Sequence, residues 1–146
     1  MFKKISFKGI ILGGIADVVG SNIWGVILVI YLLSRYHLYS LPQTKMIPQL
    51  QHLISQDPII FILNLFVGGG FTVLGGYIAA RIAKHDELLN GTLASFLCVL
   101  FALFAIGSTP ILNVLLAVLA NPLLGFAGGY LQLKQKKKVK NKIIRK

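Results

Sequence analysis

Four long apolar stretches constrain this 146-residue chain more than any other feature of its sequence. Each is close to the roughly 20 residues that a helix needs to cross the hydrocarbon core of a bilayer. They cover residues 9–33, 59–80, 88–106 and 111–131. Their residues do not alternate between polar and apolar, as the strands of a membrane barrel do. The sequence therefore predicts an all-α membrane protein whose single domain, residues 1–133, is a bundle of four transmembrane helices.

The composition agrees with a chain whose solvent is lipid. Hydrophobic residues make up 55% of the chain and charged residues only 13%, whereas an ordinary soluble domain has about 25% charged residues. A short chain has too little polar surface to cover so many apolar side chains in water. The single cysteine, Cys98, excludes an intramolecular disulfide and a cysteine-rich zinc site.

The distribution of basic residues predicts the orientation of the chain in the membrane. Thirteen of the fifteen Lys and Arg residues lie before the first span, between the second and third spans, or after the fourth. These three segments share one side of a four-span protein, and basic residues favour the cytoplasmic side. We therefore expect both termini to be cytoplasmic, in a multi-pass protein of the bacterial inner membrane.

The long connection between the first two spans, residues 34–58, carries a helical pattern. Its apolar residues recur at helical spacing, at Ile47, Leu50, Leu53 and Ile54. Pro48 suits the first turn of a helix. This pattern predicts a short amphipathic helix lying on the outer surface of the membrane. An ordered loop whose apolar side chains cap the bundle fits the same residues equally well.

Asp17 is the only ionisable residue clearly inside a span. Burying a carboxylate in a bilayer is costly, so such a residue is a functional-site hypothesis. Counting 1.5 Å per helical residue brings polar residues of the other spans to a similar depth. The predicted intramembrane polar site therefore contains Asp17, Ser21, Thr72, Ser95 and Asn121. Asp17 either fixes helix register by accepting hydrogen bonds, or serves as the proton, cation or substrate site of a small transporter or channel component.

Rows of small residues at four-residue spacing predict where the helices touch. In lipid, small residues let helices approach closely. The second span contributes Gly68 and Gly76 to such rows, and the fourth contributes Gly125 and Gly129. We expect these glycines to pack within the chain, although a second small face on the second span would also suit a homo-oligomer or a membrane protein partner. Three glycines in succession, at residues 68–70, are also compatible with a helix broken near the midplane, as in transporters.

The connection between the second and third spans is predicted to hold an inner-surface charged cluster of Arg81, Asp86 and Glu87. Asp86 is expected to cap the third span, and Glu87 suits the positive end of its dipole. His85, Asp86 and Glu87 are residue types that can bind a metal ion. Three consecutive residues do not share a helix face, however, so no metal is expected. No serine has a nucleophile-elbow pattern around it. We therefore expect neither an enzyme nor a cofactor.

Residues 134–146 form a predicted basic cytoplasmic tail with eight Lys and Arg residues. A basic cluster next to a membrane gains about 1 kcal/mol per Lys or Arg from anionic lipid. Nucleic acid would attract the same charges, but no aromatic stacking residue or nucleic-acid module accompanies them. The lipid bilayer, with anionic lipid at the tail, is therefore the expected partner.

Two short motifs carry a resemblance to a known group of proteins. They are Gly-Gly-Tyr-Ile-Ala-Ala-Arg-Ile-Ala at residues 75–83 and Glu-Leu-Leu-Asn-Gly at residues 87–91. With Asp17 in a glycine-containing first span, the sequence resembles small four-span bacterial membrane proteins of unknown function. The resemblance covers roughly the first three spans and implies that Arg81 and Glu87 act together at the inner surface. We expect a non-enzymatic helix-packing or partner-binding component; a small transporter or channel component is the alternative.

Overall fold

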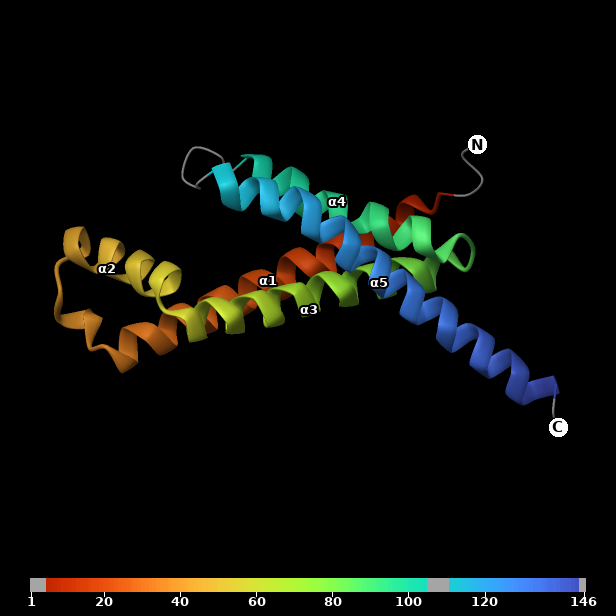
Figure 1. Ribbon diagram of the computed structural model, residues 1–146, viewed down its shortest axis with the longest axis horizontal. Helices are drawn as coiled ribbons and strands as arrows, with labels where there is room; N and C mark the ends of the chain where they lie inside the picture. Colours follow the sequence, from red (N-terminus) through yellow and green to blue (C-terminus); the bar gives the residue numbers. More distant parts are fainter. Residues whose placement is uncertain (1–4, 105–110, 145–146) are drawn as a thin grey trace. The chain divides into compact units, whose positions relative to one another are not determined.

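The computed structural model describes residues 5–104 and 111–144 of the chain. These residues form α-helices and one short 3-10 helix, and no strand occurs among them (Figure 1). The all-α prediction is therefore confirmed for the described part of the chain. Several residues of the charge count lie outside it, namely Lys3, Lys4, Arg145 and Lys146. The end of the third predicted span and the connection at residues 107–110 also lie outside it.

The helices follow the apolar stretches closely. They are α1 (Phe7–Arg35), η2 (Leu38–Ser40), α2 (Gln43–Gln56), α3 (Pro58–Ala83), α4 (Glu87–Phe104) and α5 (Ile111–Ile144). Two of them, α1 and α3, are long and apolar enough to cross a membrane, with mean hydropathies of 1.9 and 2.0. Within an apolar segment of 18 residues in each of these helices, only 22% is buried inside the protein. The fourth predicted span and most of the basic tail form one continuous helix, α5.

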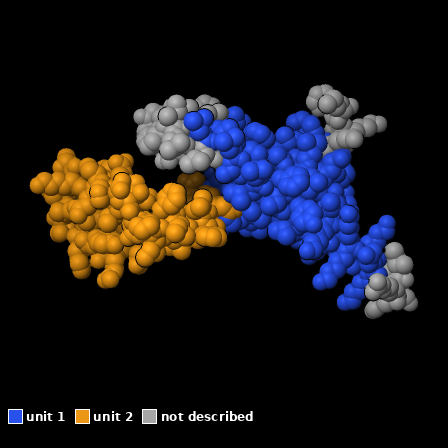
Figure 2. All heavy atoms as spheres, viewed as in Figure 1, with its two compact units in different colours: residues 1–18, 70–146 blue, residues 19–69 orange. Residues whose placement is uncertain are grey.

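The chain divides into two compact units (Figure 2). Unit 1 comprises residues 1–18 and 70–146, and unit 2 comprises residues 19–69. Helices α1 and α3 contribute to both units, α2 belongs to unit 2, and α4 and α5 belong to unit 1. Each unit has its own packing.

Unit 2 is held by a small apolar core. Leu28, Leu32 and Ile60 form its buried centre, and Trp24, Leu50 and Ile54 pack against it. Aromatic and aliphatic side chains of this size each contribute roughly 1.5–3 kcal/mol when they are fully buried from water. The start of α3 is fixed by Asp57, whose Oδ1 accepts hydrogen bonds from the backbone amides of Ile59 at 2.9 Å and Ile60 at 3.2 Å.

The helix predicted in the long connection is present as α2, but it begins earlier than the pattern indicated. The carbonyl of Pro42 accepts hydrogen bonds from the amides of Lys45 at 2.9 Å and Met46 at 3.0 Å, which starts the first turn there. Pro48 therefore lies inside the helix and not in its first turn. The segment is thus a helix and not an ordered loop, and its residues Leu50 and Ile54 pack on the core of unit 2.

Unit 1 is built on close contacts between helix backbones. Helices α4 and α5 lie side by side along much of their length (Figure 1). A Cβ added at Gly125 of α5 would lie 2.6 Å from the carbonyl oxygen of Gly91 of α4, and one at Gly129 would lie 2.5 Å from that of Glu87. At Gly76 of α3, a Cβ would lie 2.9 Å from the Cα of Gly125. Only glycine allows the three helices to approach so closely.

Gly68 differs from the other glycines that were predicted to pack. A Cβ added there would have no heavy atom of the described chain within 4 Å, and the same holds for Gly70. Both nevertheless lie inside the continuous helix α3, which is not broken at residues 68–70. The close backbone contacts lie about two turns after Gly68, where Gly75 and Gly76 face α1 and α5.

Candidate functional site

Asp17 lies on α1 in the interior of unit 1, and only 1% of its surface is exposed. The hydroxyl of Thr72 on α3 donates a hydrogen bond of 3.2 Å to Asp17 Oδ1. The neighbouring glycine makes this approach possible, because a Cβ at Gly75 would lie 2.9 Å from the Cβ of Asp17 and 2.7 Å from the carbonyl oxygen of Gly13. The structure thus brings together two of the five residues of the predicted polar site.

The other three predicted residues have different surroundings. Ser95 is 1% exposed, but its hydroxyl donates to the carbonyl of Thr92 on its own helix at 2.7 Å. The Ser95 hydroxyl also fills the space beside Gly125, where a Cβ would lie 2.6 Å from it. Asn121 is half-buried on α5. Ser21 belongs to unit 2, where it lines an open pocket of about 530 Å³ on the surface of α1.

The structure adds Cys98 to the surroundings of Asp17. The thiol of this residue, on α4, is close enough to the Asp17 carboxylate to interact with it. In the sequence, Cys98 served only to exclude a disulfide and a cysteine-rich zinc site. Its relation to Ser95 was a usable signal, because residues three apart lie on the same side of a helix.

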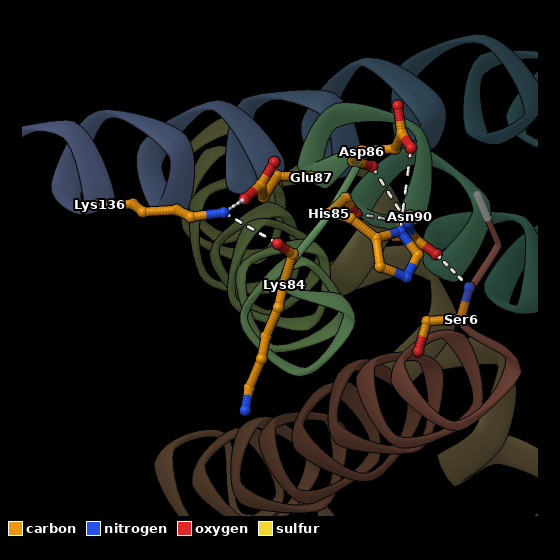
Figure 3. A network of polar contacts seen from close by, with 7 residues as sticks. All are labelled: Ser6, Lys84, His85, Asp86, Glu87, Asn90 and Lys136. Carbon is orange, nitrogen blue, oxygen red and sulfur yellow. Dashed lines mark hydrogen bonds and ion pairs between the residues drawn. The ribbon is translucent and has the colours of Figure 1, made fainter. Parts of the chain in front are cut away.

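The buried residue Asn90 connects two distant segments of unit 1 (Figure 3). Its side chain is fully buried, with 0% exposure. The amide nitrogen Nδ2 donates to the carbonyls of His85 at 3.0 Å and Asp86 at 3.1 Å, and Oδ1 accepts a hydrogen bond of 2.7 Å from the amide of Ser6. One side chain therefore closes the turn between α3 and α4 and ties it to the start of α1.

Ser6 extends this connection into α1. It directly precedes the helix, and its hydroxyl accepts a hydrogen bond of 3.2 Å from the amide of Gly9. This is the geometry of an N-cap, which satisfies one of the amides that the first turn leaves without a helical partner. Sequence reasoning missed both Ser6 and Asn90, although Asn90 lies within the Glu-Leu-Leu-Asn-Gly motif.

Asp86 does not form the expected cap of α4. Its φ of 44° lies in the left-handed region, whereas an N-cap residue usually has an extended backbone. Its Oδ2 lies 3.8 Å from Nδ1 of His85, and no hydrogen bond joins the carboxylate to an amide of α4 among the described residues. Asn90 supports this turn from the inside, so the turn is held without a carboxylate cap.

Glu87 pairs with a residue of α5 and not with Arg81. Its carboxylate lies 2.5 Å from the ammonium group of Lys136, which also donates a hydrogen bond of 2.8 Å to the carbonyl of Lys84 (Figure 3). The hydrogen bond from Lys136 holds the pKa of Glu87 below its ordinary value, against the opposing effect of burial. Among the described residues, Arg81 forms no ion pair with a carboxylate. Of the predicted cluster of Arg81, Asp86 and Glu87, Glu87 is therefore paired with Lys136, and Asp86 lies beside His85.

Lys136 was predicted only as part of the basic tail. The signal that pointed to its role is the row of small residues on the fourth predicted span, which includes Gly125 and Gly129. Lys136 follows Gly129 by seven residues, or two helical turns, and so lies on the same face of α5. Gly129 lies against the carbonyl of Glu87. Lys136, on the same face of α5 in the basic tail, is therefore the lysine expected near Glu87.

Within residues 5–104 and 111–144, no group of three His, Cys, Asp or Glu side chains is arranged to hold a metal ion. The two clusters described above therefore offer hydrogen bonding and ion pairing between helices. Comparisons with protein-family models, curated proteins and solved structures found no match to this chain.

Proposed function

We propose that this protein is a multi-pass component of the bacterial inner membrane that packs as a bundle and binds a membrane partner, without enzymatic activity. The observation that carries the proposal is the exposure of large apolar side chains along both apolar helices. More than half of the side-chain surface is exposed for Ile15, Ile23 and Ile30 of α1 and for Ile59, Phe61 and Phe66 of α3. Apolar surface of this extent marks contact with lipid or with another protein.

Four spans with cytoplasmic termini are the arrangement that we propose. Helices α4 and α5 supply the third and fourth spans. Three polar contacts in unit 1 support a common side for the basic segments: Ser6 is bonded to Asn90, and Lys136 to Glu87 and Lys84. These contacts join the start of α1, the α3–α4 turn and the basic part of α5, which are the three segments that the positive-inside rule assigns to the cytoplasm.

The surroundings of Asp17 favour a packing role over transport. A transport site must be reached by water or solute, whereas Asp17 is 1% exposed and accepts a hydrogen bond from Thr72. An acidic residue bonded across two helices fixes their register, because any axial shift leaves a buried carboxylate without its donor. In this role, Asp17 orients α1 and α3 so that the remaining faces can bind a partner.

The test for transport is solute flux in proteoliposomes containing the wild type or Asp17→Asn. We expect both to match protein-free liposomes across a panel of ions and small solutes. Flux above that background in the wild type, lost in Asp17→Asn, would instead make the protein a transporter. The matched control is Asp86→Asn, which removes a carboxylate at an exposed position outside the predicted spans.

The test for a partner is chemical crosslinking in native membranes. We expect a crosslinked species larger than the monomer, formed either with a second copy or with another membrane protein. A species that stays entirely monomeric at all crosslinker concentrations would contradict partner binding. Mass spectrometry of the crosslinked band then separates self-association from binding of a different protein.

A further inference from the structure

A polar pocket lies where the end of α3 meets α5 in unit 1. Its volume is about 250 Å³, and it is lined by Arg81, Gln132, Gln135, Lys136 and Val139. A water molecule takes up about 30 Å³ in the liquid, so the pocket has room for a group of several heavy atoms. None of the five lining residues is acidic.

The lining side chains of Arg81, Gln135 and Lys136 carry hydrogen-bond donors, and Gln132 adds a buried acceptor, its Oε1. The Arg81 guanidinium is exposed and has no carboxylate partner among the described residues. The hydroxyl of Tyr77, one turn earlier on α3, donates to Oε1 of Gln135. Because that oxygen is occupied, the amide nitrogen is the group that Gln135 can offer to a ligand.

The charge of the pocket is positive after its internal pairing is taken into account. Glu87 contacts Lys136 and neutralises one of the two cations, and the charge of Arg81 remains. A planar guanidinium binds oxyanions through two parallel hydrogen bonds, and phosphate is among the groups that it recognises best. Lys136 is held in place by Glu87 and the Lys84 carbonyl, so a ligand meets a cation that is already positioned.

We propose that this pocket binds a phosphate group, with Arg81 as the main anion contact and Gln135 and Lys136 as further donors. The same chemistry has two possible sources, the headgroup of an anionic phospholipid and free phosphate. The lipid source rests on the proposed membrane topology, which brings the end of α3 to the bilayer surface. Binding of free phosphate does not depend on that topology.

The experiment is calorimetric titration of the purified full-length protein in a neutral detergent. The probes are dihexanoyl-phosphatidylglycerol below its micelle concentration and, separately, inorganic phosphate. Three variants each lower the net charge by one: Arg81→Gln, Gln135→Glu and, as a control, Lys137→Gln. Gln135→Glu keeps an acceptor for Tyr77 and adds a charge that repels an anion. Lys137 is exposed on α5 and does not line the pocket.

We expect saturable one-to-one binding that weakens by about tenfold or more in Arg81→Gln and Gln135→Glu, the loss expected from one charge-assisted hydrogen bond. Lys137→Gln should change the affinity by about twofold or less, as an exposed charge does. Binding of the lipid alone identifies a headgroup site, and equal binding of inorganic phosphate identifies a free-phosphate site. Absence of saturable binding, or equal losses in all three variants, overturns the proposal.

The outcome is separable from the proposed function. If the membrane topology is wrong, phosphate binding with the stated variant pattern still identifies the pocket as an anion site. If the pocket is wrong, the orientation of the termini is unaffected. Thermal unfolding of each variant in the same detergent shows that a loss of binding comes from the pocket, because a misfolded variant would also lose its cooperative transition.

Discussion

Among the individual residues, Asn90 has the most demanding position, because its side chain bonds to three backbone groups from two segments. A primary amide supplies both donors and an acceptor. Aspartate lacks the donors for the carbonyls of His85 and Asp86, and leucine lacks all three groups. The choice of residue follows from the carbonyls and amide that surround it.

Replacing Asn90 with alanine should therefore destabilise the protein. In Asn90→Ala the carbonyl of His85 and the amide of Ser6 lose the bond to this side chain, whereas the carbonyl of Asp86 keeps the bond of 3.0 Å from the backbone amide of residue 90. A buried polar group without a partner costs roughly 1–3 kcal/mol. Thermal unfolding in detergent, followed by circular dichroism, measures the change. Asn141→Ala, at an exposed position of α5, serves as the control and should unfold at the same temperature as the wild type. Equal stability of Asn90→Ala and wild type would contradict the role given to this residue.

The pair formed by Glu87 and Lys136 predicts a pH dependence with a definite sign. The hydrogen bond from Lys136 lowers the pKa of Glu87 below 4.5 in the folded state. The carboxylate of Glu87 therefore binds a proton more readily in the unfolded chain than in the folded protein. The pair contributes its full stability at a pH above the ordinary pKa of glutamate, and this contribution is lost as the pH falls through the lowered pKa. Because Lys136 is half-exposed, the contribution at neutral pH is about 1 kcal/mol or less.

The measurement compares the unfolding of wild type and Glu87→Gln at a series of pH values. Wild type should be the more stable at about pH 7, and the difference should shrink as the pH falls toward about 3. Asp86→Asn is the control, since its carboxylate is exposed and has no lysine partner in the described structure. A difference that grows in acid would show that the Glu87 carboxylate is destabilised in the folded state.

Among the helices, the stability of unit 1 depends on glycines at their contacts. In Gly76→Ala the new methyl group would lie 2.9 Å from the Cα of Gly125 and 3.0 Å from its carbonyl carbon. Both are backbone atoms, which cannot move aside as a flexible side chain does. We expect a loss of stability of about 1–3 kcal/mol, the usual cost of overpacking.

Gly68→Ala is the matched substitution on the same helix. Its methyl group would have no described heavy atom within 4 Å, and alanine is the better helix former by about 1 kcal/mol in a helix interior. This variant should be as stable as the wild type or more stable. The unfolding temperature in detergent is the measurement for both substitutions, and equal destabilisation by the two would refute the proposed α3–α5 contact.

The sequence predicted the helices better than the contacts between them. Long apolar runs favour a helix wherever lipid is the solvent, so the bounds of α1 and α3 were close to the prediction. The side chain of Asp86 could not be placed in the same way, because its backbone is left-handed in a turn whose carbonyls bond to the side chain of Asn90, four residues later. Lys136 was missed for a related reason: a basic run does not show which lysine reaches Glu87 until the helix face is known.

For the whole molecule, the main prediction concerns the two sides of the membrane. Single cysteines are introduced by Ser40→Cys and Asn141→Cys in a Cys98→Ser background. In intact bacterial cells, a membrane-impermeant maleimide should label the cysteine at position 40, which follows the first span, and should label the one at position 141 only after the inner membrane is opened. The reason is the positive-inside rule, which retains basic segments in the cytoplasm.

The control for this labelling is the Cys98→Ser background, which has no thiol and should remain unlabelled in intact and opened cells. Labelling of position 141 alone in intact cells would show that the chain has the opposite orientation in the membrane. Labelling of both introduced cysteines in intact cells would mean an even number of spans between them, and would require one of α3, α4 and α5 to lie outside the bilayer.

The hydrogen bond between Ser6 and Asn90 also has a consequence for biosynthesis. Its two residues are 84 positions apart in the chain. At a synthesis rate of about 5–20 residues per second, the start of α1 waits roughly 4–17 s for its partner to be made. The first turn of α1 is therefore made well before the contact that fixes it can form. During that interval the start of α1 lacks its bond to Asn90, and a nascent chain that stalls before residue 90 never forms it.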